Sequence, residues 1–243
     1  MKKKVLLYLL LIHTAFISLS LAQRVPESAR SRAAIARAIP KINRILAAND
    51  SLTLGSPIFI RVFKASGELE VWMKQDSSDT YSLVKTYPIC YFSGKLGPKL
   101  RQGDLQAPEG FYFVSPRRMN PLSSFHLSFD IGYPNAYDRY YNRTGGFIAI
   151  HGNCVSIGCL AMTDPAIEEI FALAAGALNN GQRFFRVHVF PFRMTQQNMK
   201  KYKAHRWINY WKNLKTGYDF FEEKKIPPNV EVRGGKYVFE EDE

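Results

Sequence analysis

The sequence predicts a mainly β fold with helical additions at both ends. Three observations support this prediction. Apolar residues recur every three to four positions near the N-terminus and again toward the C-terminus, which is typical of amphipathic helices. Between these segments they alternate with polar residues, which is typical of half-buried strands. The 13 Tyr and 17 Phe also favour a β-rich body with aromatic packing.

The first 22 residues have the pattern of a signal peptide. Lys2, Lys3 and Lys4 precede an apolar run over 5–21, and Ser20-Leu21-Ala22 has the small residues of a cleavage site. We expect cleavage before Gln23 and export to the periplasm or cell envelope, with an uncleaved membrane anchor as the alternative. No other apolar run in the sequence approaches membrane length.

The composition indicates a globular domain with a sizeable core. The chain has 243 residues, of which 46% are hydrophobic and 22% charged, and this excludes a disordered class. The net charge of +12 is scattered, with one cluster over 200–206. An exported protein rarely meets nucleic acid, so we expect no nucleic-acid partner. The cluster is interpreted as a solvated helix face, with attraction to an anionic wall or membrane as the alternative.

A helical arm is predicted over 23–50. Ile35, Ile39, Ile42 and Leu46 recur at helical spacing within 28–49. Pro40 interrupts this pattern, so we expect it to kink or split the helix.

The body, 51–192, is predicted to be mostly strands. Two alternating segments flank Ser66-Gly67, which is a hairpin signal, and a third continues the meander. The strands are expected at 57–63, 68–73, 81–87, 111–115, 147–150 and 184–190. Asp164 is expected to cap a helix that has Pro165 at its first position and ends at Gly181.

The remaining segments are two loops and the C-terminal part. The segments 96–106 and 120–143 lack periodicity, and the longer one is interpreted as a substrate cover. The C-terminal extension and tail, 193–243, should contain one long helix over 195–224.

The segment 146–159 carries the chemistry. An apolar run ends at His151, and a loop containing Gly152 leads to Cys159. A thiolate is a good nucleophile when an imidazolium stabilises it, so His151 is expected to lower the thiol pKa and then protonate the leaving amine. The alternatives are a buried structural Cys and a strand-end His.

The glycines of this loop have an expected role as well. Gly152 and Gly158 allow tight turns, so the N–H groups of Gly158 and Cys159 are expected to face a substrate oxyanion. Ser156 either bonds across the loop or stabilises a turn. Together these features predict a cysteine enzyme that performs acyl transfer.

The chain has three cysteines, and an odd count suggests one bridge plus one free thiol. If a bridge exists, Cys90–Cys154 is the only pairing that leaves Cys159 reactive; the absence of any bridge is equally open. A zinc site built from His151, Cys154, Cys159 and His188 is a weaker alternative because it lacks closely spaced ligand pairs. We therefore expect no metal and no organic cofactor.

The pattern His-Gly-x-x-x-Ser-x-Gly-Cys at 151–159 resembles the active-site motif of the YkuD-type L,D-transpeptidases, which remodel bacterial peptidoglycan. The following 160–164 resembles the YafK-type branch of that family. Further similar segments are 103–112, 126–129, 133–139 and 189–195. Most members have a second His directly before the Gly-Cys, where this chain has Ile157; His126 is a candidate to take its place.

The resemblance implies a YkuD-type β-sandwich core and a peptidoglycan stem peptide with a diamino acid at its third position as substrate. Cys159 would form a thioester with that residue, and a backbone carbonyl close to Gly152 would orient His151. An incoming amine, including that of a wall-linked protein, would complete a transpeptidation. Water would instead make the chain an L,D-carboxypeptidase or an amidase that releases wall-linked protein. The candidate substrate-binding residues are His126, Tyr133, Asn135, Asp138 and Arg139. A catalytically silent wall-binding module is the alternative from another class.

Overall fold

The computed structural model describes residues 24–49 and 51–240. The predicted signal peptide therefore lies outside the described residues. Within the described part of the chain, no helix is both long and apolar enough to cross a membrane.

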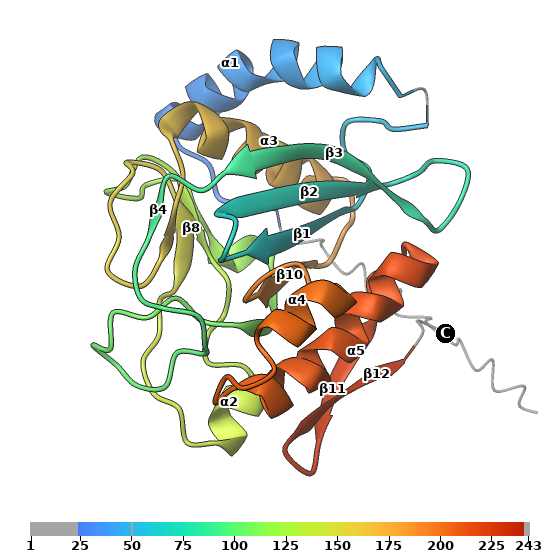
Figure 1. Cartoon of the computed structure of the whole chain (residues 1–243). Helices are drawn as coiled ribbons and strands as arrows, with labels where there is room; N and C mark the ends of the chain where they lie inside the picture. Colours follow the sequence, from blue (N-terminus) through green and yellow to red (C-terminus); the bar gives the residue numbers. More distant parts are fainter. Residues whose placement is uncertain (1–23, 50, 241–243) are drawn as a thin grey trace, which may run out of the picture.

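A five-stranded sheet forms the centre of the molecule (Figure 1). Its order is β3 (Tyr81–Pro88), β2 (Glu68–Lys74), β1 (Ile58–Phe63), β10 (Phe185–Phe190) and β5 (Gly110–Val114). β1 and β10 run parallel, whereas the other neighbouring pairs are antiparallel. The predicted hairpin around Ser66-Gly67 and the meander into β3 are confirmed.

Helices cover both faces of this sheet, which explains why all six residues of β1 are buried. Ile58, Ile60 and Val62 point into the core under α1 (Ala29–Leu46) and α3 (Asp164–Asn179). Phe59 and Phe63 point to the opposite face, toward Phe221 and Tyr218 of α5 (Ile208–Lys224). Figure 1 shows α1 and α3 above the sheet and α4 and α5 below it.

The N-terminal helix α1 is continuous through Pro40, so the expectation of a split was wrong. Ser28 and Ser31 form a capping box that fixes its start. Pro40 lies on the exposed side, while Ala38 and Ile42 are buried on either side of it. Tertiary packing of the buried face therefore maintains the helix across the missing N–H group.

A second, smaller sheet carries the residues of the sequence motif. Its order is β4 (Tyr91–Phe92), β9 (Leu160–Ala161), β8 (Ala149–His151), β7 (Ser128–Asp130) and β6 (Met119–Asn120). One face buries Phe129, Ile150 and Leu160 in the core shared with the first sheet, and the ring centroid of Phe129 lies 5.4 Å from that of Phe185. The two sheets packed through one core, with helical additions, confirm the predicted fold class.

The segment 120–143 is more regular than expected. It contains β7 and the short helix α2 (Ala136–Tyr140), and the 3₁₀ turn Pro116–Arg118 leads into β6 just before it. Asn135 caps α2 in a capping box with Asp138. Farther along, Phe147 precedes β8 with a φ of 55° and is exposed, so it does not belong to the strand predicted over 147–150. Thr163, and not Asp164, is the residue before α3.

The C-terminal part differs most from the prediction. The expected long helix is two helices, α4 (Gln196–Lys201) and α5, and a turn over 202–207 separates them. In this turn the ring of His205 stacks on Trp211, with centroids 4.3 Å apart. A hairpin of β11 (Asn229–Arg233) and β12 (Lys236–Glu240) follows, and the sequence prediction missed it.

A buried ion pair attaches the loop before β5 to the rest of the molecule. Lys64 Nζ donates to Glu109 Oε1 at 3.1 Å and to the carbonyl oxygens of Gly97 and Ala107. Glu109 also accepts from Trp211 Nε1 at 2.8 Å. These contacts hold the segment 94–109 between the central sheet and α5.

Candidate active site

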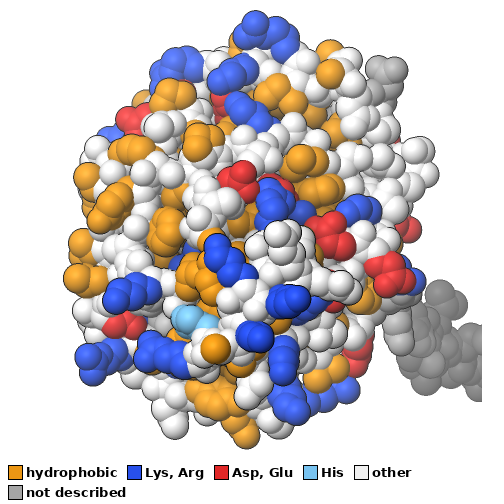
Figure 2. All heavy atoms as spheres, viewed as in Figure 1, with side chains coloured by type: hydrophobic (Ala, Val, Ile, Leu, Met, Phe, Trp, Pro, Cys, Tyr) orange, Lys and Arg blue, Asp and Glu red, His pale blue; other side chains and the backbone are white. Residues whose placement is uncertain are grey.

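His151 and Cys159 line the same cavity, whose volume is about 860 Å³. Its walls come from the loop before β5, from the segment before β8 and from the loop between β8 and β9. The other lining residues are Lys99, Gln102, Gly103, Leu105, Phe125, Gly145, Gly146, Phe147, Ile148, Val155, Ser156, Ile157 and Gly158. In Figure 2, hydrophobic side chains gather along the left-hand edge, the side on which Figure 1 shows β4 and β8.

The pairing of β8 with β9 brings the two motif residues to one face of the small sheet. Ile150 pairs with Leu160 and His151 with Ala161, so Cys159 lies beside Ala149. The Ala149 N–H donates to Cys159 Sγ at 3.4 Å. Because alternate residues of a strand face the same side, Ala149, His151 and Cys159 share the face that does not enter the core.

The imidazole of His151 has a defined tautomer. Its Nδ1 lies 2.6 Å from the carbonyl oxygen of Gly152, which accepts only, so Nδ1 carries the proton. Nε2 is thereby left with the lone pair that can take a proton from a thiol. The orienting group is a backbone carbonyl at Gly152, as the family resemblance implied, and the ring of Phe125 packs 4.6 Å away.

Burial acts on both motif residues and favours their neutral forms. It lowers the pKa of His151, with the Gly152 carbonyl opposing it. It raises the pKa of the Cys159 thiol; the Ala149 N–H opposes this rise, the charge of Asp130 adds to it and that of Lys99 opposes it. At neutral pH the resting pair is therefore a protonated thiol and a neutral imidazole that line one cavity. The expectation of a thiol pKa lowered by an imidazolium was wrong for this state.

The loop between the two residues is held by its own hydrogen bonds. Gly158, with a φ of 140°, donates its N–H to Ser156 Oγ at 3.1 Å, and Ser156 Oγ donates to the Cys159 carbonyl at 2.7 Å. Ser156 thus bonds across the loop. The Gly158 N–H, expected to face an oxyanion, is engaged by Ser156 here.

Gly152 is required by close packing. Its N–H donates to the carbonyls of Phe125 and Leu127, and a Cβ at this position would lie 2.5 Å from Asp164 Oδ1. The same Asp164 oxygen accepts from the Asn153 N–H at 2.8 Å. The start of α3 therefore fixes the backbone that carries the His151 acceptor.

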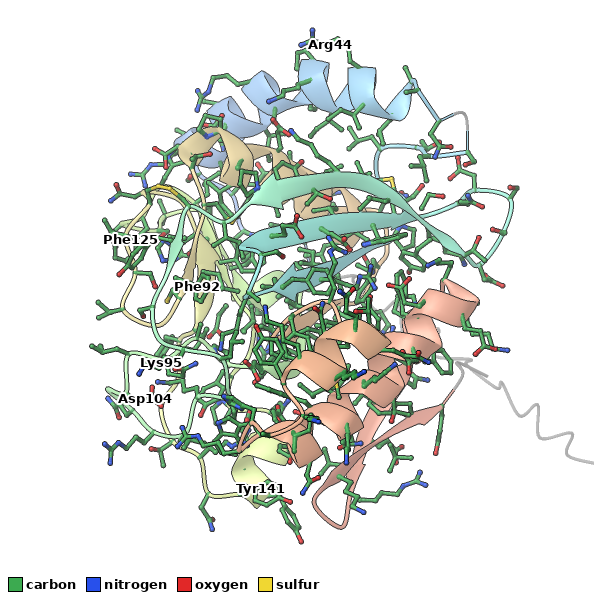
Figure 3. The ribbon with its side chains drawn as sticks, viewed as in Figure 1. Arg44, Phe92, Lys95, Asp104, Phe125 and Tyr141 are labelled. Atoms are coloured by element: carbon green, nitrogen blue, oxygen red, sulfur yellow. A yellow bond between two sulfur atoms is a disulfide. The ribbon has the colours of Figure 1, made fainter. Side chains whose placement is uncertain are left out.

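Cys90 and Cys154 form a disulfide with their Cα atoms 5.4 Å apart, and Cys159 is a free, half-buried thiol. The bridge ties the loop between β8 and β9 to the residue before β4, and a yellow bond marks a disulfide near Phe125 in Figure 3. The alternative zinc set is not assembled. Cys154 is bonded to Cys90, and His188 is buried between Phe59 and Phe111. No group of three potential His, Cys, Asp or Glu ligands occurs in the described part of the chain.

The predicted substrate residues do not line this cavity. Tyr133 Oη donates to the Lys99 carbonyl at 3.3 Å, and Asp138 pairs with Arg143 at 2.7 Å. Asn135 caps α2, and Arg139 donates to the Pro134 carbonyl. These side chains brace the segment beside the cavity. Asn135 and Arg139 line a second, smaller cavity of about 220 Å³ next to β11 and β12.

His126 does not take the place of the missing second His. Its Nε2 lies 2.9 Å from Glu168 Oε1 on α3, and Glu168 also binds Arg37 of α1. Ile157, at the position of that second His, is 79% exposed and lines the cavity. Ile157 therefore forms part of an apolar rim of the cavity, and Phe147, which is 88% exposed, extends this rim.

Most of the cavity wall was not predicted from the sequence. Lys99, Gln102 and Leu105 come from a segment that was assigned only as a loop, and Phe125 and Phe147 were not singled out. Figure 3 shows Lys95, Asp104 and Phe125 on loops at this side of the molecule. The one signal in the sequence was the presence of large apolar residues in loops rich in glycine and charged residues. These loops have no periodicity that would mark such residues as lining a cavity.

Comparison with known proteins agrees with the motif. Residues 57–189 match the family model described as the YkuD L,D-transpeptidase catalytic domain. A protein of Escherichia coli strain K12 named "Putative L,D-transpeptidase YafK" is 46% identical over 185 residues, which are 76% of this chain and 74% of that protein.

Solved structures are similar at lower identity. The helical cell shape determining protein Pgp2 of Campylobacter jejuni aligns with a TM-score of 0.46 and 18% identity, over 79% of this chain and 80% of that chain. Bd1075 of Bdellovibrio bacteriovorus aligns with a TM-score of 0.41 and 19% identity, over 74% and 78%. From the family model and the 46% identical relative, this chain belongs to the YkuD L,D-transpeptidase catalytic domain family.

Proposed function

We propose that this chain is an exported cysteine acyltransferase of the L,D-transpeptidase type that acts on peptidoglycan stem peptides at a third-position diamino acid. One observation carries the proposal: Cys159 and His151 share one sheet face and one cavity, and the Gly152 carbonyl leaves Nε2 of His151 free to accept a proton. The signal-peptide pattern of 1–22 supports export to the periplasm or cell envelope.

In the first half-reaction the Cys159 sulfur attacks the carbonyl carbon of the diamino acid. His151 Nε2 takes the thiol proton as the S–C bond forms, and the carbonyl oxygen becomes an oxyanion. The Cys159 N–H is the donor that we assign to this oxyanion. When the intermediate collapses, the proton on Nε2 passes to the leaving amine, and a thioester remains on Cys159.

This order of events fits the pKa shifts of the pair. Burial disfavours both the free thiolate and the imidazolium, so at neutral pH the resting cavity holds a neutral thiol and a neutral base. Charge separation then develops during attack on a bound substrate, where the new S–C bond consumes the thiolate. Because the thiolate is the form that is oxidised, a raised pKa of the half-buried Cys159 thiol also limits its oxidation in the resting protein.

The second half-reaction depends on the acceptor. An incoming amine gives its proton to His151 Nε2, attacks the thioester and forms a new amide, which releases the thiol. The amine of a second stem peptide or of a wall-linked protein is the proposed acceptor. Water in its place would give a carboxylate, which is the L,D-carboxypeptidase or amidase outcome.

The test is mass spectrometry of a disaccharide-tetrapeptide incubated with the protein, with and without an amine acceptor. Acceptor-linked product that disappears in Cys159→Ala supports the transpeptidase. Release of the terminal residue when water is the only acceptor assigns a hydrolase. An unchanged substrate in both arms would reject the enzyme and leave the wall-binding module.

A further inference from the structure

A row of four accessible residues crosses the small sheet and starts at the nucleophile. The register pairs Asp130 with Ala149, and one step beyond the paired residues of β8 and β9 it places Cys159 beside Ala149. Arg118 ends the 3₁₀ turn directly before β6, whose Met119 pairs with Phe129. The row is therefore Cys159, Ala149, Asp130 and Arg118. Residues opposite each other across a sheet point to the same side, so Cys159, Ala149 and Asp130 share the face that carries the thiol. The guanidinium of Arg118 lies against Gly132, two residues after Asp130.

The residues of this row are more exposed to solvent than those of the neighbouring row. Cys159, Ala149, Asp130 and Arg118 are all half-buried, whereas Ser128, His151 and Ala161 of the neighbouring row are buried. Ala149 contributes only a methyl group between the thiol and the carboxylate. Cys159 lines the large cavity and Arg118 lines the smaller one, and Ala149 and Asp130 lie between them in the row.

Within 24–49 and 51–240, neither charged residue of the row has an ion-pair partner. Asp130 accepts from the Gly132 N–H at 2.7 Å, and the described residues include no cation within ion-pair distance of it. Arg118 donates to the Phe113 carbonyl at 2.6 Å and lies over the Phe113 ring, 4.6 Å from its centroid. Asp130 and Arg118 do act on each other electrostatically without touching.

Their positions are fixed by the surrounding backbone. Gly132, with a φ of 85°, leaves room that the Arg118 guanidinium fills, since a Cβ there would lie 1.7 Å from its Nη1. Asp130 lies in β7, between β6 and β8. A negative and a positive group held side by side and unpaired match a ligand that carries an ammonium next to a carboxylate.

We propose that Asp130 and Arg118 bind the amino-acid zwitterion at the far end of the substrate's diamino acid, Asp130 holding its ammonium group and Arg118 its carboxylate. This inference rests on the proposed function, and it adds which third residue of the stem peptide the same site prefers. Adjacent strands are about 4.8 Å apart, so Asp130 lies roughly 10 Å from Cys159 across Ala149. When the reacting carbonyl of the diamino acid lies at Cys159, its extended methylene chain carries the second amino-acid centre toward Asp130.

The consequence is a preference for a third residue with a complete second centre. Lysine at that position has the ammonium group but lacks the carboxylate. Amidation of the distal carboxylate would remove the Arg118 partner, and acetylation of the distal amine would remove the Asp130 partner. Each of these losses should lower kcat/KM by about tenfold, the factor for one charge-assisted hydrogen bond.

The experiment measures kcat/KM for four tetrapeptides: with diaminopimelate, its distal N-acetyl form, its distal carboxamide, and lysine. The variants are Asp130→Asn and Arg118→Gln, and the matched control is Asp219→Asn, whose exposed carboxylate pairs with Lys215 on α5. We expect Asp130→Asn to abolish the discrimination between free and acetylated amine only. Arg118→Gln should abolish the discrimination between carboxylate and carboxamide only, and the control should retain both.

Two outcomes overturn the inference without touching the proposed function. In one, the unaltered protein turns over the substrates without discriminating among them. In the other, the variants slow all four substrates by one common factor, as a merely structural role would. If the unaltered protein turns over none of the four, the proposed function fails and the inference fails with it.

Discussion

The Nδ1–H of His151 points at the carbonyl of the next residue, Gly152, across 2.6 Å. A chain that orients its imidazole through its own neighbouring peptide needs no acidic side chain for that purpose. The geometry then depends on how the peptide is held. Gly152 donates to Phe125 and Leu127, and it has no room for a Cβ beside Asp164.

Gly152→Ala should therefore damage the chemistry through the position of His151. The new methyl group would lie 2.5 Å from Asp164 Oδ1 and 3.0 Å from the Phe125 carbonyl, so the peptide must shift. We expect kcat to fall by about a hundredfold, the cost of a misplacement near 1 Å. Gly176→Ala in α3 is the control, since its Cβ would meet Leu54 at 3.6 Å, an ordinary contact. Equal kcat in the two variants would contradict this prediction.

The neutral resting pair predicts a broad pH profile. The pKa of His151 is lowered from 6.5 and that of Cys159 is raised from 9.0, so both groups are neutral between these values. Protonation of His151 removes the base only below its lowered pKa, so kcat/KM should hold its plateau down through pH 6.5. The measurement is kcat/KM from pH 5 to 9, where a steep loss already at pH 7 would argue for an imidazolium with a raised pKa.

The same shifts predict slow alkylation of the free thiol. The thiolate is the reactive form, and burial keeps its fraction small at neutral pH. Iodoacetamide labelling of Cys159, followed by intact-protein mass, should be slow at pH 7 and accelerate through pH 9 and above. Rapid labelling at pH 6, with a rate independent of pH, would show instead a preformed thiolate.

The sequence located the motif residues because their chemistry is local. His151 ends a strand and Cys159 follows a turn, and spacing alone suggests both. Asp130 and Arg118 were not predicted because strand pairing places Asp130 near Cys159, and packing on Gly132 places Arg118 near Asp130. No local pattern in the sequence encodes either contact. The substrate contacts predicted for Asp138 and Arg139 were wrong for a related reason. The segment 120–143 was expected to be an open loop, but a capping box and the Asp138–Arg143 ion pair bind its side chains to one another.

The limits of helices and strands were likewise predicted where a local pattern sets them and missed where a tertiary contact does. The limits of β1, β2 and β3 lie within one residue of the predicted ranges, although the pairing of β2 with β3 shifts its register between Val71 and Trp72. The break between α4 and α5 contains no Gly or Pro, and the stacking of His205 on Trp211 is a tertiary contact that propensity does not report. The hairpin of β11 and β12 did carry a signal, Gly234-Gly235 between alternating residues, that was overlooked.

The Cys90–Cys154 bridge should stabilise the whole chain and also the loop that presents Cys159. It spans 64 residues, for which the chain-entropy model gives about 4 kcal/mol of unfolding free energy. Cys90→Ser with Cys154→Ser should lower the urea midpoint accordingly, and a thiol reductant should reproduce this effect in the unaltered protein. Activity should fall as well, because the loop between β8 and β9 loses its attachment to the residue before β4. A reductant that leaves the midpoint unchanged would show that the bridge is absent from the protein in solution.

The buried pair of Lys64 and Glu109 should be among the most sensitive positions outside the cavity. Both side chains are fully buried, and Glu109 also accepts from Trp211 and from the Gly97 N–H. Lys64→Met removes one charge and leaves the other without its partner, which costs about 3–5 kcal/mol of unfolding free energy.

The matched control for this substitution is an exposed pair. Lys74→Met breaks the contact with Asp79, whose side chain is 79% exposed, and should cost less than about 1 kcal/mol. Urea unfolding of both variants measures the difference. Because Glu109 holds the loop that carries Lys99 and Leu105 to the cavity, Lys64→Met should also raise KM while it still folds. An equal loss of stability in the two variants would show that the buried pair is not the anchor of this loop.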